Sequence, residues 1–433
     1  MNVIEFPPRE AWPALLERPR ENAKDIAAAV EDIIETVRRN GDEALRSYGE
    51  KFDGLRLDEL AVSDSEFDDA CSNVPTELKS AIATAKTNIE RFHQPGCATD
   101  REIETTPGVR CWSRTIPIER VGLYVPAGSA PLFSTVLMLA VPALIAGCRE
   151  VILCSPPMPD GRVDPATLYA ARLCDVDKVF KVGGAQAIAA MALGTETVPR
   201  VDKIFGPGNR YVTEAKLQVM RLGATIDMAA GPSELAVLAD ETCVPAFVAA
   251  DLLSQAEHGA DSQVLVVSTS REVVTSVALE IDKQLEELPR EEIARAALKN
   301  SKAIVVASIK DGIDLINQYG PEHLIIATRQ ADTDANAIVN AGSIFLGNFS
   351  CESAGDYASG TNHTLPTNGS ARGSSGLSLT SFMKTITLQR LTREGIEKLG
   401  PVIETMAAAE GLEAHRRAVS IRREWMGGDN SGV

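Results

Sequence analysis

The sequence predicts an α/β fold with two Rossmann-like parallel-sheet lobes and a helical C-terminal extension. From residue 116 onward, short apolar runs of strand length alternate with longer helical runs, separated by short loops rich in Gly and Pro. This alternation is typical of a parallel sheet covered by helices. A break at Gly231-Pro232 divides the alternation in two, so we expect two lobes that join near residues 120 and 232.

The region before the alternation, from residue 21 to about 92, is predicted to be helical. Lys24–Arg38 carries apolar residues at helical spacing, and Asn40-Gly41 is expected to end that helix. Glu77–Phe92 is a second long candidate, followed by a loop that contains Pro95-Gly96.

The elements of the alternation follow from apolar runs bounded by turn residues. Before Gly231 we expect strands at 120–125, 151–154, 179–182 and 203–205, and helices at 133–146, 167–174, 185–192 and 210–221. After Pro232 we expect strands at 235–238, 263–267, 303–306 and 324–327, and helices at 244–257 and 272–287. No sequence repeat of fixed period links the two parts, and the chain from about residue 379 onward is predicted to be helical.

Composition limits the possible partners. The chain has 433 residues, is 44% hydrophobic and carries a net charge of −17, which argues against nucleic acid or an anionic membrane as its main partner. The longest apolar run, 132–146, is interrupted by Pro142 and is too short to span a membrane. The N-terminus lacks the pattern of a secretory signal, and the eight scattered cysteines have no C-x-x-C pair. We therefore expect a cytoplasmic protein with reduced thiols, most of them buried.

The segment 353–367, SAGDYASGTNHTLPT, is the most informative single stretch. It places Asp356 and His363 in a region rich in Gly, Ser, Asn and Pro, a composition that supports neither a long helix nor a long strand. Loops that carry both a carboxylate and an imidazole often hold a ligand. Taken alone, Asp356 could equally cap a turn and His363 could be a satisfied loop histidine.

Three other segments also combine histidine with carboxylate or amide groups. Gln255 and His258 lie one helical turn apart, so both could reach a single ion, although a polar helix end is the simpler interpretation. Glu322-His323 joins a base and an imidazole just before an apolar strand, which suits general acid–base chemistry or merely a loop. Glu410 and His415 lie five residues apart in the tail, where a solvated helix would explain them equally well.

Two glycine-rich turns indicate a nucleotide. Val182-Gly183-Gly184 and Gly206-Pro207-Gly208-Asn209 each follow a strand and open a helix, which could present free N–H groups to a phosphate. Each turn alone is weak evidence, but two in one lobe favour a dinucleotide beyond the carboxyl ends of the strands.

Together these segments strongly resemble the histidinol dehydrogenase family over nearly the whole chain. The resemblance rests on eight segments in the family's order: VGLYVPAG (121–128), VGGAQAIAA (182–190), FGPGN (205–209), AGPSE (230–234), LLSQAEHG (252–259), PEHL (321–324), ESAGDYASGTNHTLPT (352–367) and AEGLEAH (409–415). It implies oxidation of L-histidinol through L-histidinal to L-histidine by two NAD⁺, the last steps of histidine biosynthesis. It also implies one Zn²⁺ per subunit and a homodimer with shared active sites.

The resemblance also assigns roles to individual residues. It implies that Glu322 and His323 are the catalytic acid–base pair. The zinc ligands implied are Gln255, His258, Asp356 and His415, all of which would also border the substrate. Further substrate contacts implied are Ser233, His323, His363 and Glu410, and the NAD contacts implied are Tyr124, Gln186 and Asn209.

The domain division expected from the resemblance has four parts. They are an N-terminal arm (1–20), a zinc and substrate lobe (21–120 with 235–378), an NAD-binding lobe (121–234) and a helical dimerisation extension (379–433) that completes the site of the partner subunit. One departure from the family pattern is Cys351, which stands where proline is expected. We interpret Cys351 as a residue that packs the loop, rather than as a thiol that adds to the aldehyde.

Three alternatives remain open at the level of sequence. A related zinc- and NAD-dependent dehydrogenase could oxidise another polar alcohol, although the set that includes His363 and Glu410 favours histidinol. A metal-dependent hydrolase could use Glu322 to activate water, and it would form no NADH. A non-catalytic nucleotide-binding protein would not need so complete a set of polar groups.

Overall fold

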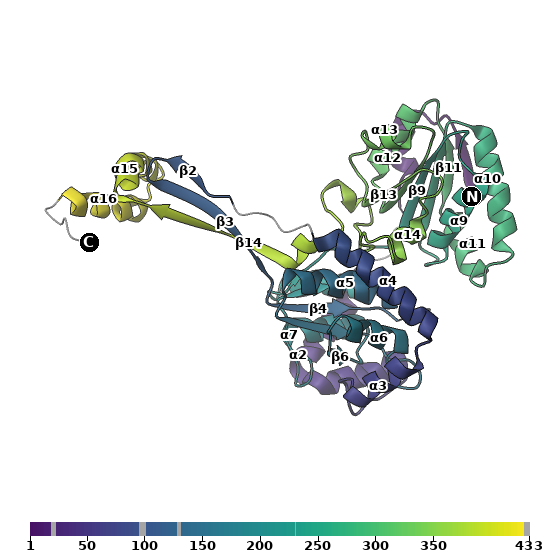
Figure 1. The fold of residues 1–433 in the computed structure, drawn as a ribbon, viewed down its shortest axis with the longest axis horizontal. Helices are drawn as coiled ribbons and strands as arrows, with labels where there is room; N and C mark the ends of the chain where they lie inside the picture. Colours follow the sequence, from purple (N-terminus) through teal and green to yellow (C-terminus); the bar gives the residue numbers. More distant parts are fainter. Residues whose placement is uncertain (19–22, 95–100, 128–130, 230, 428–433) are drawn as a thin grey trace. The chain divides into compact units, whose positions relative to one another are not determined.

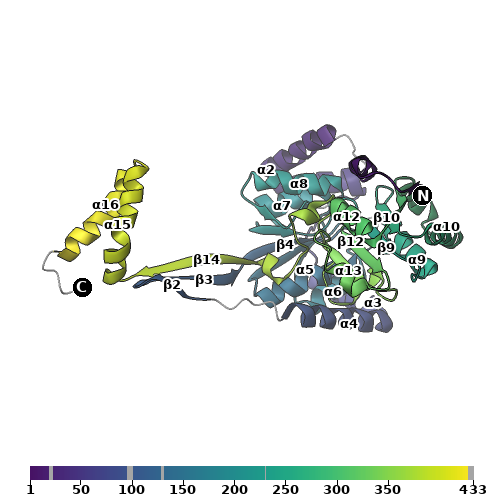
Figure 2. The same ribbon diagram turned by 90° about the horizontal axis from the view of Figure 1, so that it is seen from above.

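The computed structural model describes residues 1–18, 23–94, 101–127, 131–229 and 231–427. The chain forms two compact units, Met1–Pro95 with Ile118–Phe382 and Gly96–Pro117 with Met383–Val433. Both units are drawn in Figures 1 and 2. Among the described residues, no helix combines the length and the apolar character needed to cross a membrane.

The larger unit contains a six-stranded sheet whose strands are all parallel. In spatial order it holds β1 (Asn2–Glu5), β11 (Lys302–Val305), β10 (Gln263–Ser268), β9 (Glu234–Ala239), β12 (His323–Ala327) and β13 (Ser343–Leu346). One face is covered by α9 (Pro245–Ala256), α10 (Arg271–Leu285) and α11 (Glu291–Lys299). The other face packs against α1 (Trp12–Leu15), α12 (Ile309–Tyr319) and α13 (Ala331–Ala335). The inner strands β9, β10, β11 and β12 are therefore buried on both faces, which explains their apolar runs.

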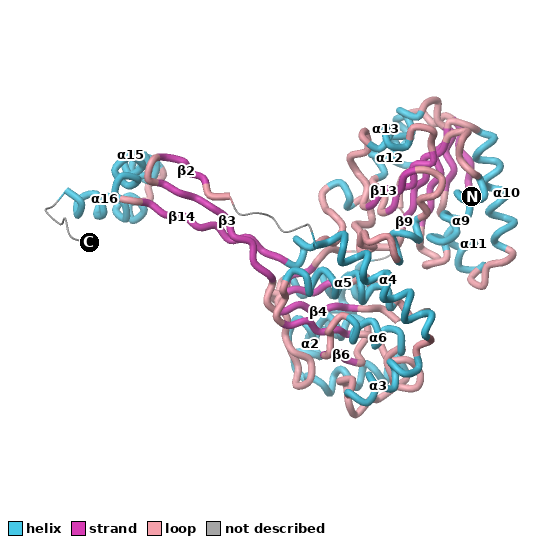
Figure 3. Tube along the Cα trace, viewed as in Figure 1, coloured by secondary structure: helices cyan, strands magenta, loops and turns pink. Residues whose placement is uncertain are grey.

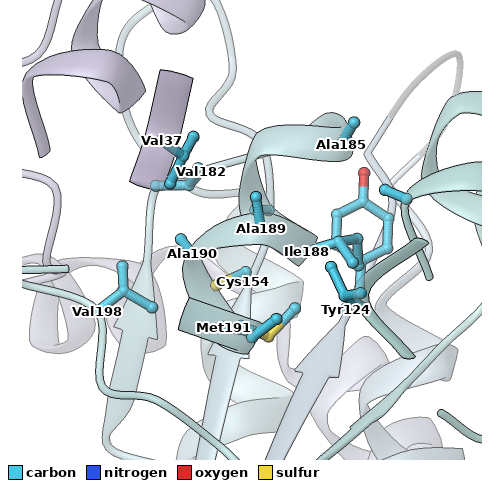
Figure 4. Packing of buried hydrophobic residues seen from close by; sticks show 14 of the residues in the cluster. Val37, Tyr124, Cys154, Val182, Ala185, Ile188, Ala189, Ala190, Met191 and Val198 are labelled. Atoms are coloured by element: carbon cyan, nitrogen blue, oxygen red, sulfur yellow. The ribbon is translucent and has the colours of Figure 1, made fainter. Parts of the chain in front are cut away.

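The same unit contains a second parallel sheet of five strands. Its spatial order is β6 (Lys178–Phe180), β5 (Glu150–Cys154), β4 (Arg120–Tyr124), β7 (Lys203–Phe205) and β8 (Thr225–Ile226). On one face, α7 (Gly184–Leu193) and α8 (Arg210–Met220) share a hydrophobic core with the N-terminal helix α2 (Ala23–Asp53). Figure 4 shows Val37 of α2, Ile188 and Met191 of α7, and Tyr124 of β4 in this core. The remaining helices of this lobe are α3 (Asp64–Asn73), α4 (Thr76–His93), α5 (Phe133–Ala146) and α6 (Pro165–Leu173).

The two sheets share one strand order. Numbered along the chain within each lobe, β4–β8 and β9–β13 both run third, second, first, fourth, fifth across the sheet. This is the order of the Rossmann fold, and the first sheet adds β1 beside its third strand. The predicted fold class of two Rossmann-like parallel-sheet lobes is confirmed, although no repeat was visible in the sequence.

The expected domain boundaries differ from this packing in two places. Residues 21–120 were expected in the lobe of the first sheet, but α2, which lies within this range, shares its core with the second sheet. The expected N-terminal arm 1–20 instead supplies β1, which pairs with β11, while Trp12 and Leu16 are buried in the core of the first sheet. The boundary between residues 20 and 21 lies outside the described residues.

The helix expected to end at Asn40-Gly41 continues after a kink. Gly41 has φ +52° and ψ −132° inside α2, and the chain then remains helical to Asp53. The Glu196 carboxylate accepts the N–H of Asp42 at 2.8 Å, so it supplies the cap for the second segment. This contact lies 154 residues away in sequence, which is why local pattern alone predicted a stop.

The smaller unit combines an antiparallel sheet with helices of the C-terminal segment, and its trace is coloured by secondary structure in Figure 3. The sheet order is β14 (Met383–Leu391), β3 (Val109–Pro117) and β2 (Ile103–Thr106), and it is followed by α15 (Arg393–Ala409) and α16 (Glu413–Gly427). The prediction that the chain is helical from residue 379 is therefore wrong for β14. Nine residues of β14 pair with β3, a long-range partner that a local pattern does not reveal.

A buried ion pair fixes the turn after β7. The Lys216 ammonium pairs with the Asp227 carboxylate, and both side chains are almost fully buried. Lys216 Nζ donates to the carbonyl of Gly206 at 2.9 Å, and the N–H of Gly206 donates to Asp227 Oδ2 at 2.8 Å. Gly206 has φ +125°, and a Cβ there would lie 2.1 Å from the carbonyl oxygen of Tyr124. Only glycine fits at position 206. Lys216 and Asp227 hold its carbonyl and its N–H, respectively.

Lys216→Met is expected to lower the free energy of unfolding by about 3–5 kcal/mol, because it leaves the buried Asp227 charge uncompensated. Urea denaturation would measure this. Arg295→Met is the control, since Arg295 forms an exposed pair with Glu291 on α11, worth about 0.3–0.5 kcal/mol. Equal losses in the two variants would contradict the importance given to the buried pair.

Candidate active site

A cleft of about 670 Å³ opens within the larger unit and is lined by residues from both lobes. It brings together five of the residues singled out from the sequence: Asn209, Ser233, His258, Glu322 and His363. They come from five separate segments, so folding makes one site out of motifs that lie up to about 150 residues apart.

The two lobes contribute opposite ends of their sheets to this cleft. Asn209 follows β7, at the carboxyl end of the second sheet, where ligands of such folds usually bind. Ser233 and Glu322 instead directly precede β9 and β12, at the amino end of the first sheet. The first lobe thus departs from the usual rule, and its site is built from residues that lead into the strands.

His323 lies at the centre of a buried group of three carboxylates. Its Nδ1 lies 3.6 Å from Glu322 Oε2, and its Nε2 lies 3.5 Å from Asp356 Oδ1 and 3.8 Å from Glu352 Oε1. Among the residues that the structure describes, His323, Glu352 and Asp356 also form a group able to hold a metal ion. Carboxyl oxygens and an imidazole nitrogen are ligands that a divalent cation accepts.

The charges in this group shift one another's pKa values. Burial acts to lower the pKa of His323, but Glu322 and Asp356 outweigh burial and raise it to about 10. Burial raises the pKa of Glu322 to about 8. The pKa of Asp356 is pushed up by burial and more strongly down by the hydrogen bond and charge of His323, so the net shift is downward. Asp356 is therefore the member that stays ionised, as a metal ligand must.

Gln255 and His258 come together at the end of α9. Gln255 Nε2 lies 3.4 Å from His258 Nδ1, which also lies 3.4 Å from Ser233 Oγ. His258 lies two residues beyond the end of α9 rather than inside it. The Gln255 side chain is fully buried, and its Oε1 has no hydrogen-bond partner among the described residues. A buried acceptor without a donor is costly, and a bound cation would satisfy it.

The segment 353–367 begins with one short helix, α14 (Glu352–Tyr357), and is otherwise irregular, as its composition predicted. Its two functional residues are in contact: His363 Nδ1 lies 2.9 Å from the backbone oxygen of Asp356. Thr135 Oγ1 lies 3.2 Å from the other ring nitrogen. Burial lowers the pKa of His363, which favours a neutral ring in the cleft wall.

Glu352 is a site residue that the sequence interpretation missed. Its Oε2 accepts a hydrogen bond from Ser254 Oγ at 2.9 Å, and its Oε1 has no hydrogen-bond partner within the described ranges. Glu352 and Asp356 stand four residues apart, so they share one face of α14. That spacing was visible in the sequence, but the loop-like composition drew attention away from a helix.

Two of the three expected NAD contacts are buried. Tyr124 and Gln186 are each only 3% exposed, and Tyr124 Oη accepts the N–H of Gly184 at 3.0 Å. The tyrosine therefore occupies an N–H at the start of α7 that was expected to receive a phosphate. Asn209 lines the cleft and caps α8, because its Oδ1 accepts the N–H groups of Tyr211 and Val212.

Glu410 and His415 belong to the smaller unit. Glu410 ends α15, His415 lies in the first turn of α16, and both are exposed. The larger unit thus supplies ten of the twelve residues implied by the resemblance, and these two form a separate group.

The cysteines differ from expectation. Seven lie in the described ranges and all are free, but only Cys154, Cys174 and Cys243 are buried. Cys351 is exposed at the start of α14, so the interpretation that it packs the loop is wrong. The eighth, Cys97, lies outside the described residues.

Comparisons with known proteins match this geometry. The family described as histidinol dehydrogenase matches residues 16–423. Histidinol dehydrogenase of Bacteroides fragilis (strain YCH46) is 54% identical over 424 residues, which cover 98% of this chain and 99% of the relative. The chain belongs to the histidinol dehydrogenase family.

Other members of the histidinol dehydrogenase family are similarly close. The enzyme of Escherichia coli (strain K12) is 54% identical over 411 residues, 94% of each chain. The crystal structure of histidinol dehydrogenase from Elizabethkingia anophelis matches with a TM-score of 0.96 at 50% identity, and covers 99% of each chain. The resemblance inferred from the eight segments is confirmed.

Proposed function

We propose that this chain is a histidinol dehydrogenase that oxidises L-histidinol through L-histidinal to L-histidine with two NAD⁺, in the last steps of histidine biosynthesis. The observation that supports this best is the two-lobed cleft, whose wall holds the base Glu322 next to His323. A cleft between two lobes can hold a small alcohol against one lobe and a dinucleotide against the other.

The donor set fits zinc. Gln255, His258 and Asp356 offer one amide oxygen, one imidazole and one carboxylate, a mixture that Zn²⁺ accepts. The orphaned Gln255 Oε1 and the group of His323, Glu352 and Asp356, whose ligand atoms lie close together, support a cation here. We assign these three residues, with His415, as ligands of one Zn²⁺ per subunit. When bound, the ion would anchor the amino and imidazole nitrogens of the substrate, and it would take no part in redox chemistry.

In the first oxidation, His323 accepts the hydroxyl proton of histidinol as hydride leaves the carbinol carbon. The acidic side chains around His323 favour its imidazolium form. A bound Zn²⁺ would oppose that positive charge and lower the pKa of His323, so that the neutral ring could take the proton. Ser233 and His363 line the same cleft and would orient the substrate by hydrogen bonds.

In the second oxidation, Glu322 removes a proton from the water that adds to the aldehyde. Burial raises the pKa of Glu322 to about 8, a suitable value for a base that works near neutral pH. His323 then accepts a proton as the hydrated aldehyde loses hydride. Two bases suit a reaction that must deprotonate both an alcohol and a water.

We place NAD⁺ at the carboxyl end of the second sheet, with Asn209, Tyr124 and Gln186 as its contacts, so the lobe of that sheet is the NAD-binding lobe. Pro207 and Gly208 line the cleft beside Asn209, which supports the position. Since Tyr124 and Gln186 are buried, their contact would require a local adjustment of the turn after β6.

We further propose a homodimer in which α15 and α16 complete the site of the partner subunit. The smaller unit leaves apolar side chains exposed at helical spacing: Val402 and Met406 on α15, and Ile421 and Trp425 on α16. Faces of this kind support a protein partner. We also propose a cytoplasmic location, which the seven free cysteines support.

The proposed function is tested by mixing the purified protein with L-histidinol and NAD⁺ and following NADH absorbance. We expect two NADH per histidinol consumed and L-histidine as the product. One NADH per substrate, or activity only with another polar alcohol, would favour a related dehydrogenase. Hydrolysis without NADH would favour a hydrolase, and nucleotide binding without turnover a non-catalytic protein.

Asp356→Ala is expected to lower metal content and activity together, because Asp356 is the only charged ligand in the proposed set. Metal analysis of the purified variant measures its metal content, and NADH formation measures its activity. Cys351→Ala is the matched control, since it changes an exposed residue beside the same helix. Full metal occupancy in Asp356→Ala would refute its assignment as a ligand.

A further inference from the structure

The peptide groups of one residue, Glu234, hold both members of the proposed catalytic pair. Its N–H donates to Glu322 Oε2 at 2.8 Å. Its carbonyl oxygen lies 3.3 Å from His323 Nδ1, a contact in which the ring N–H donates. Because Glu322 and His323 are themselves 3.6 Å apart, the position of the Glu234 backbone determines how the two groups face each other.

The Glu234 side chain is buried and clamped from the opposite side. It is 2% exposed and forms a bidentate pair with Arg18, whose Nε donates to Oε1 and whose Nη2 donates to Oε2 at 2.7 Å. The N–H of Asn368 donates to Oε1 at 3.0 Å. Both carboxylate oxygens are therefore occupied, and the side chain has no freedom to rotate.

Arg18 is itself fixed by more than this pair. Its guanidinium lies over the Tyr319 ring, 4.1 Å from the centroid, and Nη2 also donates to the Tyr319 carbonyl at 3.0 Å. Tyr319 Oη donates to Gln263 Oε1 at 2.8 Å, in a fully buried contact. The planar guanidinium of Arg18 stacks on an aromatic ring and binds a carboxylate through two N–H groups at the same time. The ammonium group of Lys cannot make both contacts equally well.

We propose that Arg18, acting through Glu234, is a positioning residue that holds Glu322 and His323 in their reactive arrangement. This inference rests on the proposed function, because it assigns the two groups to catalysis. Arg18 does not touch the pair and lies 216 residues before Glu234. The N-terminal segment, expected to be an arm, thus takes part in building the site.

The expected size follows from the geometry of proton transfer. A base must lie within hydrogen-bonding reach of its proton, and a misplacement of about 1 Å can cost about 100-fold in rate. Loss of the Arg18 clamp lets the start of β9 move and carries the Glu234 peptide groups with it. Binding of NAD⁺ by the other lobe should be unaffected.

The test uses three variants. Arg18→Lys keeps the charge but loses the bidentate guanidinium, and Arg18→Met leaves the buried Glu234 carboxylate without its cationic partner, so Arg18→Met could fail to fold. Arg18→Met/Glu234→Gln removes both charges and leaves the peptide groups in place. In the double variant and in Arg18→Lys, we expect kcat per folded enzyme to fall about tenfold or more, with KM for NAD⁺ unchanged.

A double-mutant cycle separates positioning from simple destabilisation. The double variant is combined with Glu322→Gln, and oxidation of L-histidinal is measured. If Arg18 and Glu234 act through Glu322, the double variant lowers kcat by a smaller factor in the Glu322→Gln background than in the wild type. If they do not act through Glu322, the double variant lowers kcat by the same factor in both backgrounds, so the two losses multiply.

Lys86→Met is the control, because Lys86 forms a partly buried pair with Glu90 on α4, and neither residue lines the cleft. This control should lower the melting temperature and leave kcat per folded enzyme unchanged. Combined with Glu322→Gln, it should show the same rate loss as Glu322→Gln alone. Multiplicative losses, or an unchanged kcat in the folded Arg18 variants, would overturn the positioning role. Absence of NADH formation by the wild-type protein would instead overturn the proposed function, so the two failures are distinguishable.

Discussion

His323→Asn is expected to slow both oxidations by about 10²–10⁴-fold, while Glu322→Gln slows chiefly the oxidation of L-histidinal. The difference follows from the roles assigned to the two neighbours. His323 accepts a proton in each step, from the hydroxyl of histidinol and then from the hydrated aldehyde. Glu322 is needed only when water adds to the aldehyde. Supplying L-histidinol or L-histidinal separately with NAD⁺ and comparing the two rates measures this.

The structure adds a condition to this test. Glu322 Oε2 accepts the N–H of Glu234, and the amide oxygen of Gln can accept the same hydrogen bond. Glu322→Gln should therefore keep its place and lose only its basicity, and its melting temperature should stay close to that of the wild type. If the variant slowed only the alcohol step, the roles of Glu322 and His323 would have to be exchanged.

Mixing two inactive variants is expected to restore activity. His258→Ala removes a proposed ligand in the larger unit, and His415→Ala removes a proposed ligand in α16 of the smaller unit. In a dimer with two-fold symmetry whose sites each combine both chains, a heterodimer has one site with both lesions and one with none. Activity should return to about half of the wild-type value per heterodimer on this count.

Co-expression with two different affinity tags allows the heterodimer to be purified and its activity compared with each parent. His258→Ala mixed with Asp356→Ala is the matched control, because both residues lie in the larger unit of the same chain and every site would carry one lesion. A verified heterodimer of His258→Ala and His415→Ala without activity would mean that α16 serves the site of its own subunit.

Much of the fold could be predicted because the inner strands are buried on both faces. Runs such as Leu235–Leu238 and Val264–Val267 are apolar without interruption, and glycine or proline closes most of the intervening helices and loops. The helix predicted at 133–146 coincides with α5 (Phe133–Ala146). Local composition decides elements of this kind, so sequence alone suffices.

Elements that depend on distant partners could not be predicted in this way. β1 and β14 have partially exposed, mixed sequences, and they are strands because β11 and β3 lie beside them. The continuation of α2 beyond Gly41 depends on the carboxylate of Glu196. Which sheet α2 covers is a matter of tertiary packing, and nothing in its own periodicity distinguishes the two sheets.

The candidate site divides along the same line. Residue types that carry chemistry, such as the Glu322-His323 pair and Gln255 with His258, stood out by sequence, and Glu322 and His258 line the cleft. Glu352 and the clamp of Glu234 by Arg18 did not stand out, because their importance lies in burial and in contacts across the fold. Tyr124 stood out by sequence as an NAD contact, whereas in the structure its hydroxyl accepts the backbone N–H of Gly184.

The pairing of β3 with β14 has a consequence for synthesis on the ribosome. Arg114 pairs with Ile386, about 270 residues later. At about 5–20 residues per second, β3 waits roughly 14–54 s for its partner strand. During that time its edge is open to other nascent chains. Arg110 and Arg114 are exposed on this strand, and charged side chains of this kind discourage strand-to-strand aggregation.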